Sequence, residues 1–318
     1  MTSPAPALPD TLTDPTLPGD PGPGRAWLAA TVAMALEEDL GVTDRRDVTT
    51  QATISPSVLG TADLVAREDG TVAGLAAVPE TLRQVCEIFD LAPVRVEHLV
   101  VDGTRVRAGD VLARLTGPVQ ALLVAERTML NLASRASGVA TAARTWTDVL
   151  DTVVRADGSR ARVLDTRKTT PGLRALDKYA VRCGGGTNKR MGLYDVAMVK
   201  DNHVVAAGSV AAAVAAVRER FPDVPVQVEA DTLAQAVEAV EAGADFLLLD
   251  NMDDDALRAT VEAVRALEPV RGKVELEATG NLSLDRAAAV AATGVDHMSV
   301  GALTHSAPIL DLALDLRA

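Results

Sequence analysis

Residues Val226 to Asn251 read VQVEADTLAQAVEAVEAGADFLLLDN, and this stretch decides the fold class. Two short apolar runs, Val226–Val228 and Phe246–Leu249, flank a segment whose apolar residues recur at helical spacing from Leu233 to Ala242. The pattern predicts a strand, a helix and a second strand. Because a helical crossover of this length joins parallel strands, the stretch predicts an α/β fold.

The same alternation continues on both sides of this stretch. A long helix is expected over Val119–Leu150, and the pattern then predicts further short apolar strands separated by helices. The other expected strands are Arg162–Leu164, Val196–Val199, Val274–Leu276 and His297–Val300, and the other helices are Val204–Arg220, Asp254–Leu267 and Leu284–Ala292. Repeated βα units indicate an open sheet or a barrel.

The chain before residue 120 has a different pattern. Helical spacing is seen at Trp27–Asp39 and Pro79–Phe89, whereas Gln51–Val78 and Val94–Gly117 alternate like strands. Strands that lie beside helices without regular alternation indicate a separate α+β domain. Residues 1–24 hold seven of the sixteen prolines and no periodic apolar pattern, so they are expected to form a disordered arm.

Composition excludes several classes of protein. The net charge of -13 argues against nucleic acid and against anionic membrane surfaces, and no apolar run reaches transmembrane length. The only cysteines, Cys86 and Cys183, are too few for a disulfide framework, and the N-terminus lacks a signal-peptide pattern. A cytoplasmic protein is expected.

Within this acidic chain, cations gather in one block. Four of the five lysines and four arginines lie between Asp165 and His203, and Gly184–Gly186 interrupt that block. Ordinary solvated surface charges are the alternative interpretation. However, Arg167 and Lys168 follow one predicted strand and Lys200 ends the next, and strand ends are where βα barrels place their chemistry. The block therefore predicts a site for a small polyanion with carboxylates and phosphates.

Glu229 and Asp250 end two consecutive strands and are candidate ligands for Mg²⁺, which takes one or two carboxylates and keeps several waters. The alternative is a helix cap, which Asp231 or Asn251 could equally supply. The last strand ends, Glu277–Asn281 and Ser299–Ala302, carry glycine and hydroxyl residues and are weaker candidates for phosphate binding. No zinc-type, Walker-type or dinucleotide-binding spacing is present.

Taken in order, these motifs resemble quinolinate phosphoribosyltransferases, the decarboxylating enzymes also called nicotinate-nucleotide pyrophosphorylases. The resemblance covers about residues 35–315 and includes EEDLGVTDRRDVTT, AREDGTVAGL, AERTMLNLASRASGVAT and TGVDHMSVGALTHS. It implies an N-terminal α/β sandwich domain at 25–126, joined by 303–318, and an open seven-stranded α/β barrel at 127–302. It also implies a homodimer or higher assembly with a shared active site.

The resemblance implies phosphoribosyl transfer from phosphoribosyl pyrophosphate to quinolinate with decarboxylation, a step of NAD biosynthesis that uses Mg²⁺ and no organic cofactor. Lys168, Lys200, Glu229 and Asp250 would be catalytic, with the metal at Glu229 and Asp250. Quinolinate would be bound by Arg127, Thr166, Arg167, Lys189 and Arg190. Phosphates would be bound by Lys168, Lys200, Asn202, His203, Thr279, Gly280, Asn281, Ser299, Val300, Gly301 and His305.

Two residues depart from the family pattern. Lys189 stands where the family usually has histidine, and this lysine keeps a positive charge that would pair with a carboxylate. Asn281 stands where a glycine is expected after Thr279-Gly280. The change at residue 189 leaves open a related phosphoribosyltransferase that uses nicotinate or another aromatic acid.

Two rival functions come from single features. Lys200 at a barrel strand end could be the nucleophile of a Schiff-base aldolase. The segment VVDGTRVRAGDVLARLTG is similar to the hairpin of biotinyl or lipoyl carrier domains, but residues 1–167 contain no lysine for attachment. The segment is therefore expected to be structural.

Overall fold

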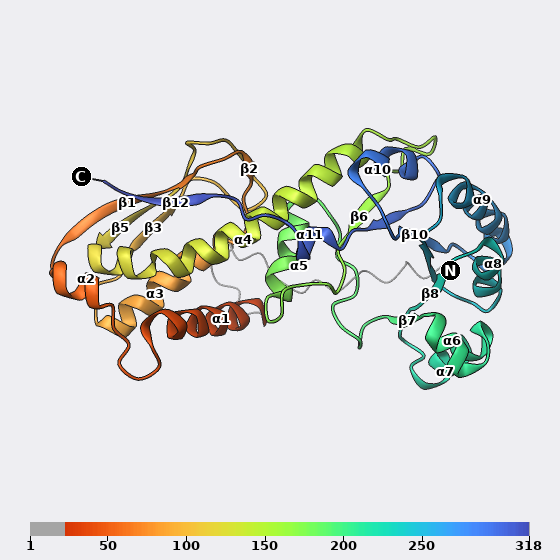
Figure 1. Ribbon diagram of the computed structural model, residues 1–318, viewed down its shortest axis with the longest axis horizontal. Helices are drawn as coiled ribbons and strands as arrows, with labels where there is room; N and C mark the ends of the chain where they lie inside the picture. The colour runs from red at the N-terminus through yellow and green to blue at the C-terminus, as the bar shows by residue number, and fades with distance from the viewer. Residues whose placement is uncertain (1–22, 318) are drawn as a thin grey trace. The chain divides into compact units, whose positions relative to one another are not determined.

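The computed structural model describes residues 23–317 (Figure 1). These residues divide into two compact units: one holds 145–169 and 186–305, and the other holds the remainder. The predicted Pro-rich arm lies outside the described residues except for its last two, which begin helix α1 (Pro23–Leu40) and so are helical rather than disordered.

The N-terminal unit is built on a four-stranded antiparallel sheet. Its strand order is β12-β1-β5-β3, with β1 at Leu59–Ala66, β3 at Arg95–His98, β5 at Val111–Pro118 and β12 at Leu312–Arg317. A two-stranded sheet joins β2 (Gly70–Thr71) to β4 (Arg105–Val106). Helices α3 (Ala77–Phe89) and α4 (Val119–Asp151) lie along one face of the larger sheet (Figure 1). The unit also contains α5 (Arg174–Cys183).

Strand β12 is fastened to the sheet by a buried carboxylate. Asp63 on β1 accepts a 2.9 Å hydrogen bond from Arg114 on β5 and ion-pairs with Arg317 on β12. The hydrogen bond from Arg114 holds the pKa of Asp63 below its ordinary range. A charge shared by three neighbouring strands therefore fixes the register of the C-terminal strand.

One strand prediction in this unit is wrong at its first residues. Val48–Thr53 form helix α2, although the alternation that begins at Gln51 indicated a strand. Asp47 explains the difference, because its side chain accepts hydrogen bonds from the backbone N–H groups of Thr49 and Thr50. An N-cap of this kind starts a helix against the β propensity of threonine.

The second unit is built on six parallel strands. Their order is β6-β11-β10-β9-β8-β7, and the bounds are β6 Arg162–Leu164, β7 Ala197–Val199, β8 Val226–Ala230, β9 Phe246–Asp250, β10 Glu275–Thr279 and β11 His297–Ser299. All six strands predicted from the alternation are confirmed, and the edges β6 and β7 do not pair with each other, so the sheet is open. Among the described residues the seventh position is only a single parallel bridge, Leu164 to Thr187, because the preceding glycines do not sustain a strand.

Helices connect these strands. They are α6 Asp201–Ala207, α7 Val210–Arg220, α8 Leu233–Glu241, α9 Asp254–Arg271 and α10 Leu284–Ala291, and the short α11 Ala302–His305 follows the last strand. The single helix predicted over Val204–Arg220 is wrong: Gly208 ends α6 at φ +94° and Ser209 caps α7. Within residues 23–317, no helix is long and apolar enough to cross a membrane.

One face of the parallel sheet is polar. Alternation along the strands places Gln227 and Glu229 of β8 on the same face, as it does Glu275 and Glu277 of β10. Contacts from Gln227 to Glu277 and from His297 to Glu275 link these strands across that face. Gln227 on β8 thus reaches past β9 to Glu277 on β10, and His297 contacts Glu275 on the adjacent strand. Within the described residues, Oε1 of Gln227 and Nδ1 of His297 are buried without a hydrogen-bond partner.

This polar face predicts acid sensitivity. Glu275 accepts hydrogen bonds from His297 (3.2 Å) and Lys273 (2.6 Å), and chiefly the histidine lowers its pKa from 4.5 to about 2. Because the folded pKa lies below the unfolded value, the stabilisation is complete above pH 4.5 and is lost as the pH falls towards 2.

We therefore expect Glu275→Gln to destabilise the protein at pH 6 by no more than about 3 kcal/mol and to be nearly neutral near the folded pKa. Urea unfolding of both proteins at pH 6, 4 and 3 measures this difference. A difference in the free energy of unfolding that is constant over this range would contradict the assignment.

Candidate active site

The carboxyl ends of the six parallel strands carry most of the predicted site residues. A buried carboxylate holds the site residues at the end of β6 in place. Asp165, directly after β6, is fully buried; it accepts a 2.5 Å hydrogen bond from the Asn188 side chain and a 2.9 Å bond from the Lys189 backbone N–H. Asp165 therefore holds the 188–190 segment against the end of β6. The sequence offered only its position after an apolar strand as a sign of this role.

Two arginines, Arg167 and Arg190, lie close enough to repel each other. The Arg190 side chain is largely buried, and it donates a 3.1 Å hydrogen bond to the Val196 carbonyl oxygen. Burial first, and then the charge of Arg167, lower the pKa of Arg190. Within the described part of the chain, the Nε atom of Arg167 is buried without a hydrogen-bond partner. Two adjacent guanidinium groups with unused donor capacity are suited to bind an anion.

Lys189 takes part in a buried network that we call the Glu277 network, consisting of Lys189, Gln227, Glu277 and Ser299. The Nζ of Lys189 lies 2.6 Å from Oε1 of Glu277, and Nε2 of Gln227 lies 2.8 Å from Oε2. The Ser299 hydroxyl also donates to Oε1 of Glu277. Gln227 was not among the predicted site residues, and Glu277 was named only as the start of a strand end that could bind phosphate, although a glutamate inside an apolar strand was a usable signal.

Three carboxylates gather at the ends of β8 and β9. Glu229, Asp231 and Asp250 each offer an oxygen within 4.8 Å of the others. Burial, followed by the charges of Glu229 and Asp231, raises the pKa of Asp250. Asp231 was considered only as a helix cap, but it directly follows β8 and lies two positions after Glu229, so the alternation of the strand brings both side chains to the same face.

Lys200 reaches this acidic cluster. It follows β7, and its Nζ lies 2.6 Å from Oε2 of Glu229. Lys200 thus lies next to a carboxylate, whereas a Schiff-base lysine is activated in an apolar pocket or beside another cation. Its backbone N–H donates to Nδ1 of His203 at 3.0 Å, and both His203 and Asn202 are exposed at the start of α6.

The loops after β9 and β10 approach each other closely. A Cβ atom on Gly280 (φ +79°) would lie 2.3 Å from Oδ1 of Asn251 and 2.8 Å from Oδ1 of Asp250, so only glycine fits. Asn281, at φ +47°, donates a 3.1 Å hydrogen bond to the Asn251 side chain. Thr279 precedes this turn and pairs with Asp250 in the sheet.

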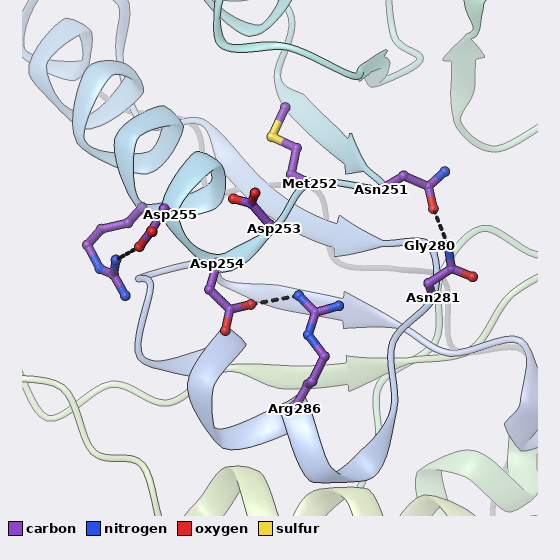
Figure 2. Close-up of a pocket in the computed structure, with 9 residues that line it drawn as sticks. Asn251, Met252, Asp253, Asp254, Asp255, Gly280, Asn281 and Arg286 are labelled. Carbon is purple, nitrogen blue, oxygen red and sulfur yellow. Dashed lines mark hydrogen bonds and ion pairs between the residues drawn. The ribbon is translucent and has the colours of Figure 1, made fainter.

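Beside this turn lies a hollow of about 670 Å³, and Figure 2 shows residues that line it. It is lined by Asn251, Met252, Asp253, Asp254, Asp255, Arg258, Gly280, Asn281 and Arg286. Arg286 donates to Asp254 at 2.6 Å, and Arg258 donates to Asp255 at 2.7 Å. The hollow is therefore polar, and its two arginines are already paired with aspartates.

A second glycine lies at the end of β11. A Cβ atom on Gly301 would lie 3.1 Å from Nε2 of His305 and 3.2 Å from Cδ of Lys168, so these side chains pack over the glycine. The Thr304 hydroxyl donates to the Lys168 carbonyl oxygen at 2.8 Å. Two neighbouring predicted residues differ in solvent exposure. Val300 is buried and donates its N–H to the Leu164 carbonyl oxygen, whereas Thr166 is half-buried and its hydroxyl oxygen accepts the N–H of Lys168 at 3.1 Å.

Of the predicted site residues, only Arg127 belongs to the N-terminal unit. It is exposed on α4, whereas the others lie in the unit of the parallel sheet. Its side chain is accessible to a partner.

Comparisons with known proteins agree over nearly the whole chain. Residues 47–137 match the family described as quinolinate phosphoribosyl transferase, N-terminal domain, and residues 139–315 match its C-terminal domain. A nicotinate-nucleotide pyrophosphorylase (carboxylating) of Mycobacterium leprae is 45% identical over 90% of this chain and 96% of its own length. A quinolinate phosphoribosyltransferase (decarboxylating) of Nicotiana tabacum is 35% identical over 91% of this chain and 82% of its own.

Solved structures match as well. The nicotinate-nucleotide pyrophosphorylase of Francisella tularensis superposes with a TM-score of 0.80 at 33% identity, and it covers 92% of this chain and 96% of its own. The match extends over both units, each of which therefore has the fold of its counterpart.

Proposed function

The chain belongs to the quinolinate phosphoribosyltransferase family, and from this membership we propose how its own side chains carry out the reaction. It is a pentosyltransferase of NAD biosynthesis that transfers the phosphoribosyl group of phosphoribosyl pyrophosphate to quinolinate and releases pyrophosphate and CO₂. The product is nicotinate mononucleotide. The observation that carries this function to the site is the pair Arg167 and Arg190, whose adjacent charges require an anion.

Quinolinate is a dianion, and two guanidinium groups are suited to it. Arg190 and Arg167 present planar forks of N–H donors, which bind carboxylates in bidentate fashion. The unused Nε of Arg167 supports a role as donor to such a group. Thr166 adds a hydroxyl. Lys189 directly precedes Arg190 in the sequence and is assigned to the same quinolinate site.

Phosphates of the second substrate are assigned to the neighbouring strand ends. Lys168 and His305, packed over Gly301, and Lys200 with Asn202 and His203 at the start of α6 supply donors and positive charge. The turn Thr279–Asn281 and the backbone of Ser299–Gly301 complete the set. The Ser299 hydroxyl already donates to Glu277, so its backbone is the part assigned to phosphate.

Glu229 and Asp250 are the proposed Mg²⁺ ligands, and the position of Asp231 supports adding it to them. The fit is chemical: burial and then the charges of Glu229 and Asp231 raise the pKa of Asp250, and a bound cation would offset both effects. When bound with phosphoribosyl pyrophosphate, the ion would stabilise the negative charge of the departing pyrophosphate. Removal of divalent cations by EDTA should therefore abolish turnover, and added Mg²⁺ should restore it.

The residues act mainly by orientation and electrostatics. Departure of pyrophosphate leaves positive charge on the ribosyl centre, and the nearby carboxylates of Glu229 and Asp250 stabilise that charge. Arg167 and Arg190 hold the pyridine ring so that its nitrogen faces this centre. Once the nitrogen is bonded to ribose, the ring accepts the electron pair that the adjacent carboxylate leaves behind as CO₂. No covalent intermediate with the enzyme is needed.

A direct assay tests the function. Purified protein is given phosphoribosyl pyrophosphate and Mg²⁺ with either quinolinate or nicotinate, and the products are identified by mass spectrometry. Nicotinate mononucleotide from quinolinate with one equivalent of CO₂ is the expected result. Product from nicotinate alone would support the related phosphoribosyltransferase instead.

A homodimer with shared sites is also proposed, because Arg127 is exposed in the unit that lacks the other site residues. Arg127→Ala and Arg190→Ala should each inactivate the enzyme. Mixing the two variants under conditions of subunit exchange should restore roughly a quarter of wild-type activity, since one site in each mixed dimer is intact. No recovery despite proven exchange would mean that Arg127 acts outside the partner's site.

A cytoplasmic location is proposed on composition. The sequence has only two cysteines, Cys86 and Cys183, too few for a disulfide framework, as expected in a reducing compartment. The net charge of -13 opposes binding to nucleic acid.

A further inference from the structure

Lys189, one of the cations assigned to quinolinate, forms a buried ion pair with Glu277. Its side chain is 9% exposed, and its Nζ lies 2.6 Å from Oε1 of Glu277, which is fully buried. Ser299 donates to the same oxygen and Gln227 donates to the other at 2.8 Å. Both oxygens of Glu277 are therefore committed within the Glu277 network, and the carboxylate has a fixed position.

Glu277 acts on more than one cation of the site. Glu277 raises the pKa of Arg190, whereas burial and Arg167 lower it, so this carboxylate acts on Arg190 as well as on Lys189. Asp195 raises the pKa of Arg190 as well, so Glu277 is not the only carboxylate that this arginine faces. Lys189 is matched with Glu277 through their direct contact, which leaves Arg167 and Arg190 as the cations available to an anionic ligand.

We propose that Glu277 is a positioning residue that neutralises Lys189 and fixes its side chain, so that the pair recognises the substrate by shape and Arg167 and Arg190 alone match its two negative charges. This inference rests on the proposed function, since it takes quinolinate as the ligand. It changes the expected role of Lys189 from a carboxylate-binding cation to one half of a neutral pair. Glu277 is then the residue that neutralises the lysine at position 189.

The proposal separates two variants that a simple cation model ranks alike, because both lack the Lys189 ammonium group. Lys189→Met leaves the buried Glu277 carboxylate unpaired beside an anionic substrate, so quinolinate binding should weaken on the order of 30-fold or more. The double variant Lys189→Met/Glu277→Gln removes both charges and leaves no buried ion. It should bind quinolinate within a few-fold of wild type.

Glu277→Gln alone gives a second readout. The freed ammonium group adds positive charge near the dianion, so the quinolinate Kd should not rise, but the ring is no longer held in one orientation. We expect kcat to fall about 10-fold or more while the quinolinate Kd stays the same or decreases. A purely structural role for Glu277 would weaken binding and turnover together.

Isothermal titration calorimetry with quinolinate and steady-state kinetics on the full chain test this inference, and thermal unfolding identifies any variant that does not fold. Glu275→Gln is the matched control: it removes a carboxylate two residues earlier on β10 that also pairs with a lysine, and it should leave quinolinate affinity and kcat unchanged at pH 7. If Glu277→Gln alone fails to fold, the double variant still decides. Double-variant affinity as weak as that of Lys189→Met would overturn the proposal, because Lys189 would then bind the substrate directly.

The outcome is distinguishable from failure of the proposed function. If wild-type protein makes no nicotinate mononucleotide from quinolinate, the substrate is wrong and the variants carry no information on it. If wild-type protein is active and the double variant is the weakest binder, the function stands and the role of Glu277 as a positioning residue is refuted.

Discussion

Replacing Arg190 with alanine is expected to reduce kcat/KM for quinolinate by about 10²- to 10⁴-fold, because a bidentate arginine supplies two charge-assisted hydrogen bonds of roughly 1.5–3 kcal/mol each. The side chain is largely buried and held at the Val196 carbonyl, so its fork is oriented before substrate arrives. Arg167 also repels it in the absence of an anion. Removing it should therefore leave the folded protein intact or slightly more stable.

Two variants sharpen this test. Arg190→Lys keeps the charge but loses the planar fork, so most of the loss should remain. Arg162→Ala removes an exposed arginine at the opposite end of β6 and should leave kcat/KM unchanged. Steady-state kinetics with quinolinate measure all three. An Arg190→Ala enzyme within a few-fold of wild type would show that this arginine does not contact the substrate.

The largest effect on stability is expected at Gly138, in the middle of α4. A Cβ atom there would lie 1.9 Å from the Pro308 carbonyl oxygen and 2.8 Å from Cα of Ile309. The 308–310 segment crosses the helix at this point, held by a 3.0 Å hydrogen bond from the Leu310 N–H to the Ser134 carbonyl. Both clashing atoms belong to backbone, so neither can rotate away.

Gly138→Ala should therefore destabilise the protein by about 3 kcal/mol or more, although alanine favours a helix interior by about 1 kcal/mol over glycine. Urea unfolding measures the change. Asn131→Ala, at an exposed position of the same helix, is the control and should be neutral or slightly stabilising. A stabilising Gly138→Ala would mean that the crossing segment does not lie against α4.

The sequence was sufficient for the parallel sheet because each strand is a short apolar run with a polar residue at its end. The runs that end at Glu229 and Asp250 show the principle: apolar periodicity locates the strand, and the carboxylate marks the edge where the loops meet. The same reasoning predicted that Lys168 and Lys200 lie at that edge. The fold and the general place of the site were therefore predictable.

Side-chain contacts between strands were not predictable in this way. The roles of Glu277 and Asp231 depend on which residues of neighbouring strands share a face, and one sequence does not state the register. Local rules failed elsewhere for the opposite reason. A single cap, Asp47, produced helix α2, and Gly208 with Ser209 divided an expected helix, since short-range hydrogen bonds outweighed the longer apolar pattern.

The place of β12 has a consequence for how the molecule is made. β1 pairs with β12 through Ala62 and Leu316, although every strand of the parallel sheet is synthesised between them. On the ribosome, the outer edge of β1 stays unpaired until the rest of the chain has emerged, so the first domain to begin folding is the last to finish. In the meantime that edge is a template for wrong pairing with another chain. Expression as two separate pieces, cut after α4, would part β1 from β12 and leave this edge permanently open.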